Sequence, residues 1–209
     1  MIDSYVDKTL EHFKINETNN LEDYLKRLYF IYPTLHVNHE ELGDIINEAQ
    51  KRFNTSFHRI KVIGSKHQGF SFMDKNGDGE IKYVQDDSDI DLAIIDSYLF
   101  NKLSTNTLIE TNNFQDKTKF KPDKFMGKKN VLNYFSYYRK NLISGFIRPD
   151  SLGCYRDRKL FKDFSEDMKS EYDIKISAAV YLNEISFIMR LDKQIRQFYE
   201  MRVIQDGLK

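Results

Sequence analysis

The sequence predicts an α+β fold in which a small mixed β-sheet is flanked by helices from both ends of the chain. Apolar residues recur at helical spacing through residues 1–55, alternate with polar residues in strand-like segments at 58–63 and 90–95, and return to helical spacing in 191–209. Because no Gly/Ser/Pro-rich stretch separates these regions, we expect residues 1–209 to form a single domain.

Three amphipathic helices are expected before the first strand. Their apolar positions are Tyr5, Val6, Leu10 and Phe13, then Leu21, Tyr24, Leu25 and Leu28, then Leu42, Ile45, Ile46, Ala49 and Phe53. Turn-forming residues at 18–20 and Pro33 separate them, and Asn38 followed by Glu40 and Glu41 is typical of a capped helix start.

The first strand segment alternates Ile60 and Val62 with charged residues and ends at Gly64-Ser65. The second has apolar side chains at 90, 92, 94 and 95. Between them, the turn-forming residues 74–79 lie between two strand-like segments, which predicts a β-hairpin insertion over 70–86.

The second half is expected to begin with a polar, lysine-rich loop over 104–130. A helix carrying Val131, Tyr134, Phe135, Tyr138 and Leu142 follows, and another helix is expected over 156–170. Residues 172–177 alternate as a strand does, and the last helix uses Leu191, Ile195, Phe198 and Tyr199.

Composition limits the partners and the kinds of site that this chain can have. Net charge is zero, so no global field attracts the molecule to nucleic acid or an anionic membrane, and any such contact must be local. A single cysteine, Cys154, excludes an intrachain disulfide and a cysteine-based zinc site. The N-terminus has no basic segment followed by an apolar run, and no apolar run is long enough to span a bilayer, so we expect a cytoplasmic protein without a membrane contact.

Asp89 and Asp91 are the leading candidates for chemistry. In a strand, successive side chains point to opposite faces, so these two carboxylates share one face while Ile90 and Leu92 pack on the other. Magnesium is bound in proteins by one or two carboxylates together with substrate phosphate oxygens. The alternative for an isolated Asp-x-Asp pattern is a pair of solvated strand residues.

Gly64 and Ser65 supply a context for phosphate. A glycine after an apolar strand lets the backbone approach a phosphate, and a hydroxyl can donate to it. Lys66 follows directly and is a further candidate for a phosphate contact.

Together, Val62-Ile63-Gly64-Ser65 and Ser88-Asp89-Ile90-Asp91-Leu92 resemble the signature of the polymerase-β-like nucleotidyltransferases, in particular small stand-alone bacterial members. The 23 residues between Ser65 and Asp89 exceed the compact form of the motif, and the hairpin insertion accounts for the excess. The resemblance implies a nucleotidyltransferase core over 56–190.

The resemblance also implies the chemistry. A hydroxyl of RNA, protein or a nucleotide would attack the α-phosphorus of a nucleoside triphosphate, with ATP the leading substrate and Mg²⁺ or Mn²⁺ held by Asp89 and Asp91. Gly64, Ser65 and Lys66 would hold the phosphates. The third carboxylate of the family is assigned to Asp173, with Asp150 as the second choice. A role in bacterial defence or a toxin–antitoxin system follows from the same resemblance.

Other interpretations remain open. A degenerate member of the family would act as a regulator or antitoxin that binds a partner protein. Residues 74–81 match the first part of an EF-hand loop, but Gln85 stands where a bidentate Glu is expected, so a tight turn competes with a calcium site. His67 lies next to the phosphate loop. The basic run that contains Lys117, Lys119, Lys121, Lys124, Lys128 and Lys129 is either a solvated loop or a contact for triphosphate or RNA.

Overall fold

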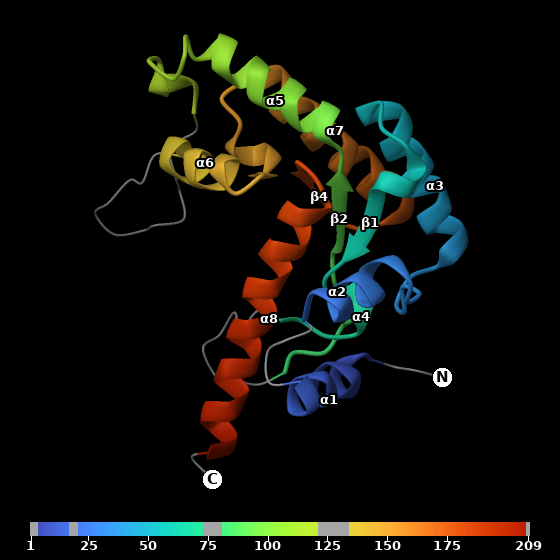
Figure 1. Ribbon diagram of the computed structural model, residues 1–209. Coiled ribbons are helices and arrows are strands. Elements are labelled where there is room, and N and C mark those ends of the chain that lie inside the picture. Colours follow the sequence, from blue (N-terminus) through green and yellow to red (C-terminus); the bar gives the residue numbers. More distant parts are fainter. Residues whose placement is uncertain (1–3, 17–20, 73–80, 121–133, 208–209) are drawn as a thin grey trace.

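The computed structural model describes residues 4–16, 21–72, 81–120 and 134–207. Its helices lie on both sides of a small sheet (Figure 1). They are α1 (Val6–Asn16), α2 (Leu21–Phe30), α3 (His39–Phe53), α4 (Ser65–Gln68), α5 (Ser97–Glu110), α6 (Tyr134–Ile143), α7 (Tyr155–Tyr172) and α8 (Glu184–Gly207), with 3-10 turns at Phe57–Arg59, Lys117–Lys119 and Pro149–Ser151.

The sheet is mixed and has the order β1-β2-β4-β3 in the described part of the chain. β1 (Ile60–Ile63) runs antiparallel to β2 (Ile90–Ile95), which pairs in parallel with β4 (Ile176–Tyr181), and the short β3 (Phe146–Ile147) runs antiparallel to β4. The α+β class is therefore confirmed.

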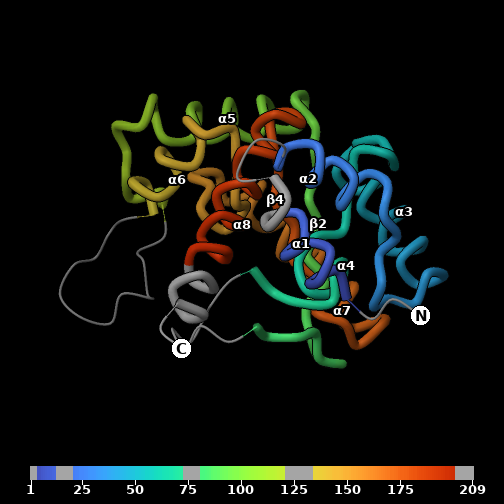
Figure 2. Tube along the Cα trace, turned by 60° about the horizontal axis from the view of Figure 1, so that its bottom comes forward, coloured from blue at the N-terminus to red at the C-terminus, as the bar shows by residue number. Residues whose placement is uncertain are grey.

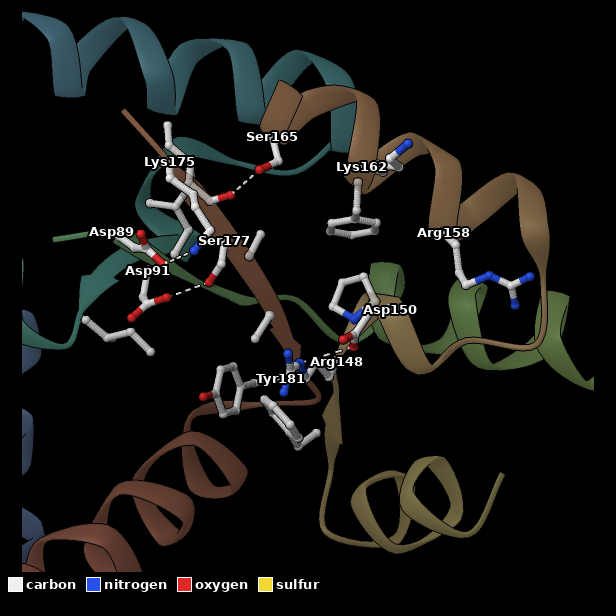
Figure 3. A pocket seen from close by; sticks show the side chains of 18 of the residues that line it. Asp89, Asp91, Arg148, Asp150, Arg158, Lys162, Ser165, Lys175, Ser177 and Tyr181 are labelled. Carbon is white, nitrogen blue, oxygen red and sulfur yellow. Dashed lines mark hydrogen bonds and ion pairs between the residues drawn. The ribbon is translucent and has the colours of Figure 1, made fainter. Parts of the chain in front are cut away.

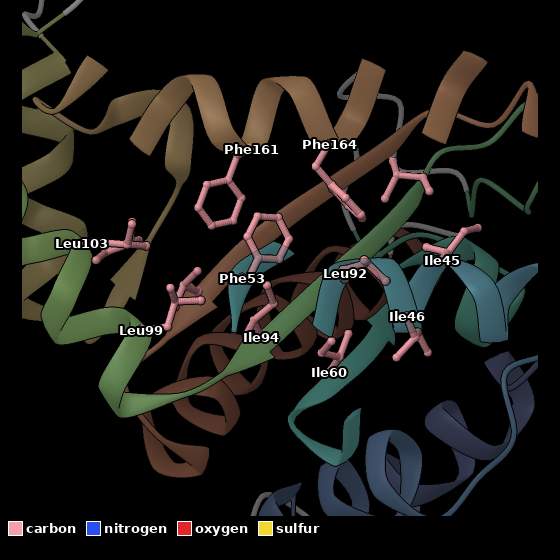
Figure 4. Packing of buried hydrophobic residues seen from close by; sticks show 14 of the residues in the cluster. Ile45, Ile46, Phe53, Ile60, Leu92, Ile94, Leu99, Leu103, Phe161 and Phe164 are labelled. Atoms are coloured by element: carbon pink, nitrogen blue, oxygen red, sulfur yellow. The ribbon is translucent and has the colours of Figure 1, made fainter. Parts of the chain in front are cut away.

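One face of the sheet packs on α3, α5 and α7. Leu92 and Ile94 of β2 belong to this core together with Phe53, whose ring stacks on that of Phe161 with 4.2 Å between centroids (Figure 4). Because the strands bury these alternate positions, the side chains between them must point to the other face.

The other face packs on α1, α2 and α8. Its core contains Ala93 and Tyr181 from the sheet and Phe187 and Leu191 from α8. Figure 1 shows α8 beginning near β4 and running down past the sheet, and Figure 2 shows α3 and α6 at opposite ends of the molecule. Asp91 has the same parity as Ala93, so it lies on the face that α8 covers.

Several local predictions are confirmed. The three N-terminal helices form where the apolar spacing predicts them, Asn38 accepts hydrogen bonds from the backbone of Glu40 and Glu41, and the helix expected over 156–170 is α7. Part of the expected hairpin is present as an antiparallel bridge between Phe70 and Tyr83, whereas its turn and the calcium-like loop at 74–80 lie outside the described residues.

Two predictions are wrong, and one element was missed. The loop expected from residue 104 is helical up to Glu110, because Leu103 and Thr107 continue a buried helical face. The strand expected over 172–177 begins only at Ile176, since α7 continues to Tyr172. The two-residue β3 was not predicted. No helix in the described ranges is long and apolar enough to cross a bilayer.

Candidate functional site

Asp89 and Asp91 lie where the chain enters β2. Asp91 pairs with Ile63, the last residue of β1, and Asp89 directly precedes the strand. The antiparallel pairing therefore brings the end of β1 next to the beginning of β2. Both carboxylates are partly exposed on the face that α8 covers.

Gly64 faces Asp91. Its backbone has φ 74° and ψ −160°, a conformation that side chains rarely adopt, and a Cβ placed on it would lie 3.0 Å from Oδ2 of Asp91. The glycine thus allows the chain to turn from β1 into α4 while keeping space in front of the carboxylate. The structure brings together the two segments of the motif, although 23 residues separate Ser65 from Asp89.

Two cavities meet at Asp91. The Ser65 cavity, of about 600 Å³, is lined by Gly64, Ser65 and Gln68 and by the segment 81–85. The Arg158 cavity, of about 960 Å³, is lined by Asp89, Lys175 and Ser177 and extends along α7 to Arg158. Both volumes are in the range of about 300–1,000 Å³ that is usual for small-ligand sites. Asp91 lines both cavities, so it lies at their boundary.

Lys66 does not line either cavity. Its Nζ donates to the carbonyl oxygens of Gln85, at 3.4 Å, and Asp86, at 3.0 Å. The lysine expected to hold phosphate therefore fixes the segment that leads to Asp89. Ser65 remains the candidate for a hydroxyl contact with phosphate.

Two residues of the neighbouring strand complete the site, and no sequence pattern indicated their role. Asp91 pairs with Ser177 of β4, whose Oγ donates to Oδ1 of Asp91 at 2.5 Å. Lys175 directly precedes Ile176, the first residue of β4 that pairs with β2, and therefore lies next to Asp89. Its Nζ lies 2.6 Å from Oδ2 of Asp89 (Figure 3). Each carboxylate thus has a polar partner from the β4 segment.

Asp173 is not part of this cluster. It caps the C-terminus of α7 in the left-handed conformation, with φ 54°, is exposed, and lines neither cavity. The expectation that it begins a strand beside Asp91 is therefore wrong. Asp150 lines the Arg158 cavity, but Arg148 pairs with it at 3.1 Å and Figure 3 shows it apart from Asp89 and Asp91.

A third metal-binding side chain does not join the aspartate pair in the described ranges. There, no three His, Cys, Asp or Glu side chains are close enough together to hold a metal ion. Magnesium that reaches a protein with a nucleotide needs only one or two carboxylates, because phosphate oxygens and water supply the remaining ligands. Asp89 and Asp91 fit a cation of that kind and do not fit a cage made by protein alone.

Gln68 is a buried polar residue beside the Ser65 cavity. The side chain is fully buried, its Oε1 accepts from the hydroxyl of Tyr29 at 2.7 Å, and its Nε2 has no hydrogen-bond partner in the described structure. Burial raises the pKa of Tyr29 well above its ordinary value, which keeps that hydroxyl protonated. An unpaired buried donor of this kind costs about 1–3 kcal/mol.

His67 has a structural role. It is 2% exposed, stacks on Tyr29, and its ring nitrogens contact the Leu28 carbonyl at 2.6 Å and the Thr34 hydroxyl at 3.0 Å. Burial lowers the pKa of His67 to about 4, so the ring is neutral near pH 7. A substrate contact through this imidazole is therefore excluded in this conformation.

The basic run is only partly described. Lys117 and Lys119 form a 3-10 turn, and Lys119 pairs with Glu110 at 3.4 Å. The turn lies outside both cavities. Lys121, Lys124, Lys128 and Lys129 lie outside the described residues.

We expect Gly64→Ala to destabilise the protein by about 1–3 kcal/mol, because alanine is strained at this positive φ. The new methyl group would also displace the Asp91 carboxylate, which lies 3.0 Å from the position of the added Cβ. Gly43→Ala is the matched control, since a Cβ at that helical position meets nothing within 4 Å. Urea denaturation measures the loss of stability; equal stability of the two variants would contradict the role of Gly64.

No family model, curated protein or solved structure matches the chain.

Proposed function

We propose that the chain is a metal-dependent nucleotidyltransferase with a polymerase-β-like core. The observation that carries the proposal is the close approach of Gly64 to the Asp91 carboxylate at the boundary of two ligand-sized cavities, where a Cβ on the glycine would lie 3.0 Å from Oδ2. The strand-end glycine and the strand-start aspartate are the two parts of the sequence motif. Their contact supports one composite site.

The Ser65 cavity is suited to the nucleoside triphosphate. Gly64 leaves room for phosphate beside the backbone, and the Ser65 hydroxyl can donate to it. Mg²⁺ or Mn²⁺ supplies positive charge that stabilises the phosphates when it is bound. Asp89 and Asp91 would hold that cation, and ATP is the first nucleotide to test.

The Arg158 cavity is suited to the acceptor, an RNA or protein hydroxyl. Its lining contains six basic and five acidic side chains, and Arg158 and Arg190 are basic groups that an acceptor could contact. In the proposed reaction the acceptor oxygen bonds to the α-phosphorus, the bond from that phosphorus to the α–β bridging oxygen breaks, and pyrophosphate leaves. The hydroxyl proton passes to Asp91 or to water, since Asp91 faces both cavities.

The test is transfer of label from each α-³²P nucleoside triphosphate to RNA or protein of a cell extract, with Mg²⁺ or Mn²⁺. We expect the wild-type protein to label one fraction and to release pyrophosphate, and Asp91→Asn to do neither. Equal labelling by both proteins would assign the transfer to another site.

A second candidate is a non-catalytic regulator that retains nucleotide or partner binding. It is favoured by Lys175 and Ser177, which stand beside the aspartates where a third carboxylate is absent from the described structure. Binding of Mg²⁺-ATP without pyrophosphate release, under any acceptor tested, would favour this regulator over the transferase.

A further inference from the structure

Lys175 is held beside Asp89 by the backbone. The amide of Ile90 donates to the Lys175 carbonyl at 2.9 Å, directly before the parallel pairing of Ile90 with Ile176. Lys175 and Ser177 therefore share the face of Asp89 and Asp91. The lysine side chain is 64% exposed, so it reaches the carboxylate from solvent and can also leave it.

The ammonium group of Lys175 competes electrostatically with a metal ion. It lies 2.6 Å from Oδ2 of Asp89, within the space that a cation on this oxygen would need. A cation on the other carboxylate oxygen would lie within about 5 Å of the ammonium, where like charges repel. The competition is modest, because an exposed ion pair of this type contributes about 0.2–1 kcal/mol.

We propose that Lys175 is a built-in competitor for the divalent cation at Asp89, which weakens cation binding a few-fold when no nucleotide is present. With a triphosphate bound, the displaced ammonium, which lines the neighbouring Arg158 cavity, gains the phosphates at the Asp91 boundary as a new anionic partner. The competition at Asp89 requires only the ion pair, whereas its coupling to nucleotide rests on the proposed function.

The experiment measures Mn²⁺ affinity without nucleotide, by the electron paramagnetic resonance signal of free Mn²⁺. Lys175→Met removes the charge and keeps an unbranched side chain. We expect it to bind Mn²⁺ about 1.4- to fivefold more tightly than wild type, which is the ion-pair energy expressed as affinity. Lys162→Met is the matched control, because Lys162 lines the same cavity but pairs with Glu166 at 3.1 Å.

The double variant Asp89→Asn/Lys175→Met tests the location of the effect. Compared with Asp89→Asn alone, it should show no further gain in Mn²⁺ affinity. The proposal is overturned if Lys175→Met gains nothing over wild type, if Lys162→Met gains as much, or if the gain persists without the Asp89 carboxylate. Undetectable Mn²⁺ binding by Lys175→Met at millimolar concentration also overturns it.

Addition of ATP separates this proposal from the proposed function. ATP should raise the Mn²⁺ affinity of the wild type by a larger factor than that of Lys175→Met, because the wild type displaces the ammonium with or without ATP but gains its attraction to the phosphates only with ATP. If ATP changes neither affinity, the nucleotide-binding function and the coupling fail, while a gain in nucleotide-free Lys175→Met still supports competition at Asp89. If both proteins respond to ATP by the same factor, the coupling is overturned and nucleotide binding stands.

Discussion

Asp91→Ala is expected to reduce nucleotidyl transfer at least about a hundredfold and to remove most Mg²⁺-ATP affinity. Asp91 faces Gly64 and lines both cavities, so its loss removes charge from the position where metal, phosphate and acceptor would meet. Losing one preorganised electrostatic group from a catalytic site typically lowers the rate by about 10²–10³. Pyrophosphate release and isothermal titration calorimetry measure the two losses.

Asp163→Ala is the matched control for Asp91→Ala. Asp163 lines the Arg158 cavity but is paired with Lys159 on the exposed side of α7. Its removal changes the charge of the cavity equally and should change transfer by less than about twofold, because exposed ion pairs contribute little. A similar loss in both variants would show a general charge effect and would remove Asp91 from the proposed mechanism.

The part of the site that the sequence predicts depends on local patterns. Alternation over 90–95 places Asp89 and Asp91 on one face, and a glycine at the end of an apolar strand marks the turn into α4. The two segments lie together because β1 and β2 are antiparallel neighbours, so the intervening insertion returns the chain to the same end of the sheet. Local patterns, together with the expected hairpin, were therefore sufficient to predict that Gly64 lies close to the two aspartates.

Asp173 shows where local patterns fail. Residues 172–177 alternate as a strand does, but Phe161, Phe164 and Met168 continue a buried helical stripe that reaches Tyr172 in the same core. The packing of that stripe extends α7, and the chain then turns at Asp173 in the left-handed conformation. Tertiary packing therefore decided where the helix ended, and the alternation alone could not show it.

Lys175 and Ser177 could not be assigned because their role depends on strand register. The sequence shows that residues 175 and 177 share a face, but only the parallel pairing of Asp91 with Ser177 places them beside the aspartates. That pairing joins segments 86 residues apart. The sequence thus predicted that Asp89 and Asp91 share a face, and it did not indicate the lysine and serine that lie beside them.

Asp96→Ala is expected to destabilise the fold by about 2–4 kcal/mol. Asp96 is 2% exposed and caps α5, with Oδ1 accepting from the amides of Tyr98 and Leu99. Its Oδ2 accepts from Thr55 at 2.5 Å and from Arg59 at 2.9 Å. Loss of a cap costs about 1 kcal/mol and loss of charged hydrogen bonds about 1.5–3 kcal/mol. Urea denaturation measures the change.

Asp96→Asn separates the cap from the charge. Asparagine is a good N-cap, so its Oδ1 can still accept from the amides of α5. Its Nδ2 would replace the oxygen that faces Arg59, which sets two donors against each other. We expect this variant to lose about half as much stability as Asp96→Ala. Equal losses would show that the cap contributes little and the charge nearly all.

The charge of Asp96 also determines how its contribution to the stability of the fold changes with pH. Burial alone would raise the pKa of Asp96, but hydrogen bonds from Thr55, the Leu99 amide and Arg59 outweigh it and the pKa is lowered. Its contribution is therefore present above the unfolded value of about 3.9 and is lost as the pH falls through the lower folded value. The stability gap between wild type and Asp96→Asn should stay constant from about pH 7 to 5 and narrow below about pH 4, by urea denaturation at each pH. If the stability difference widens in acid, the pKa of Asp96 is raised rather than lowered by folding, and its carboxylate does not stabilise the fold through its charge.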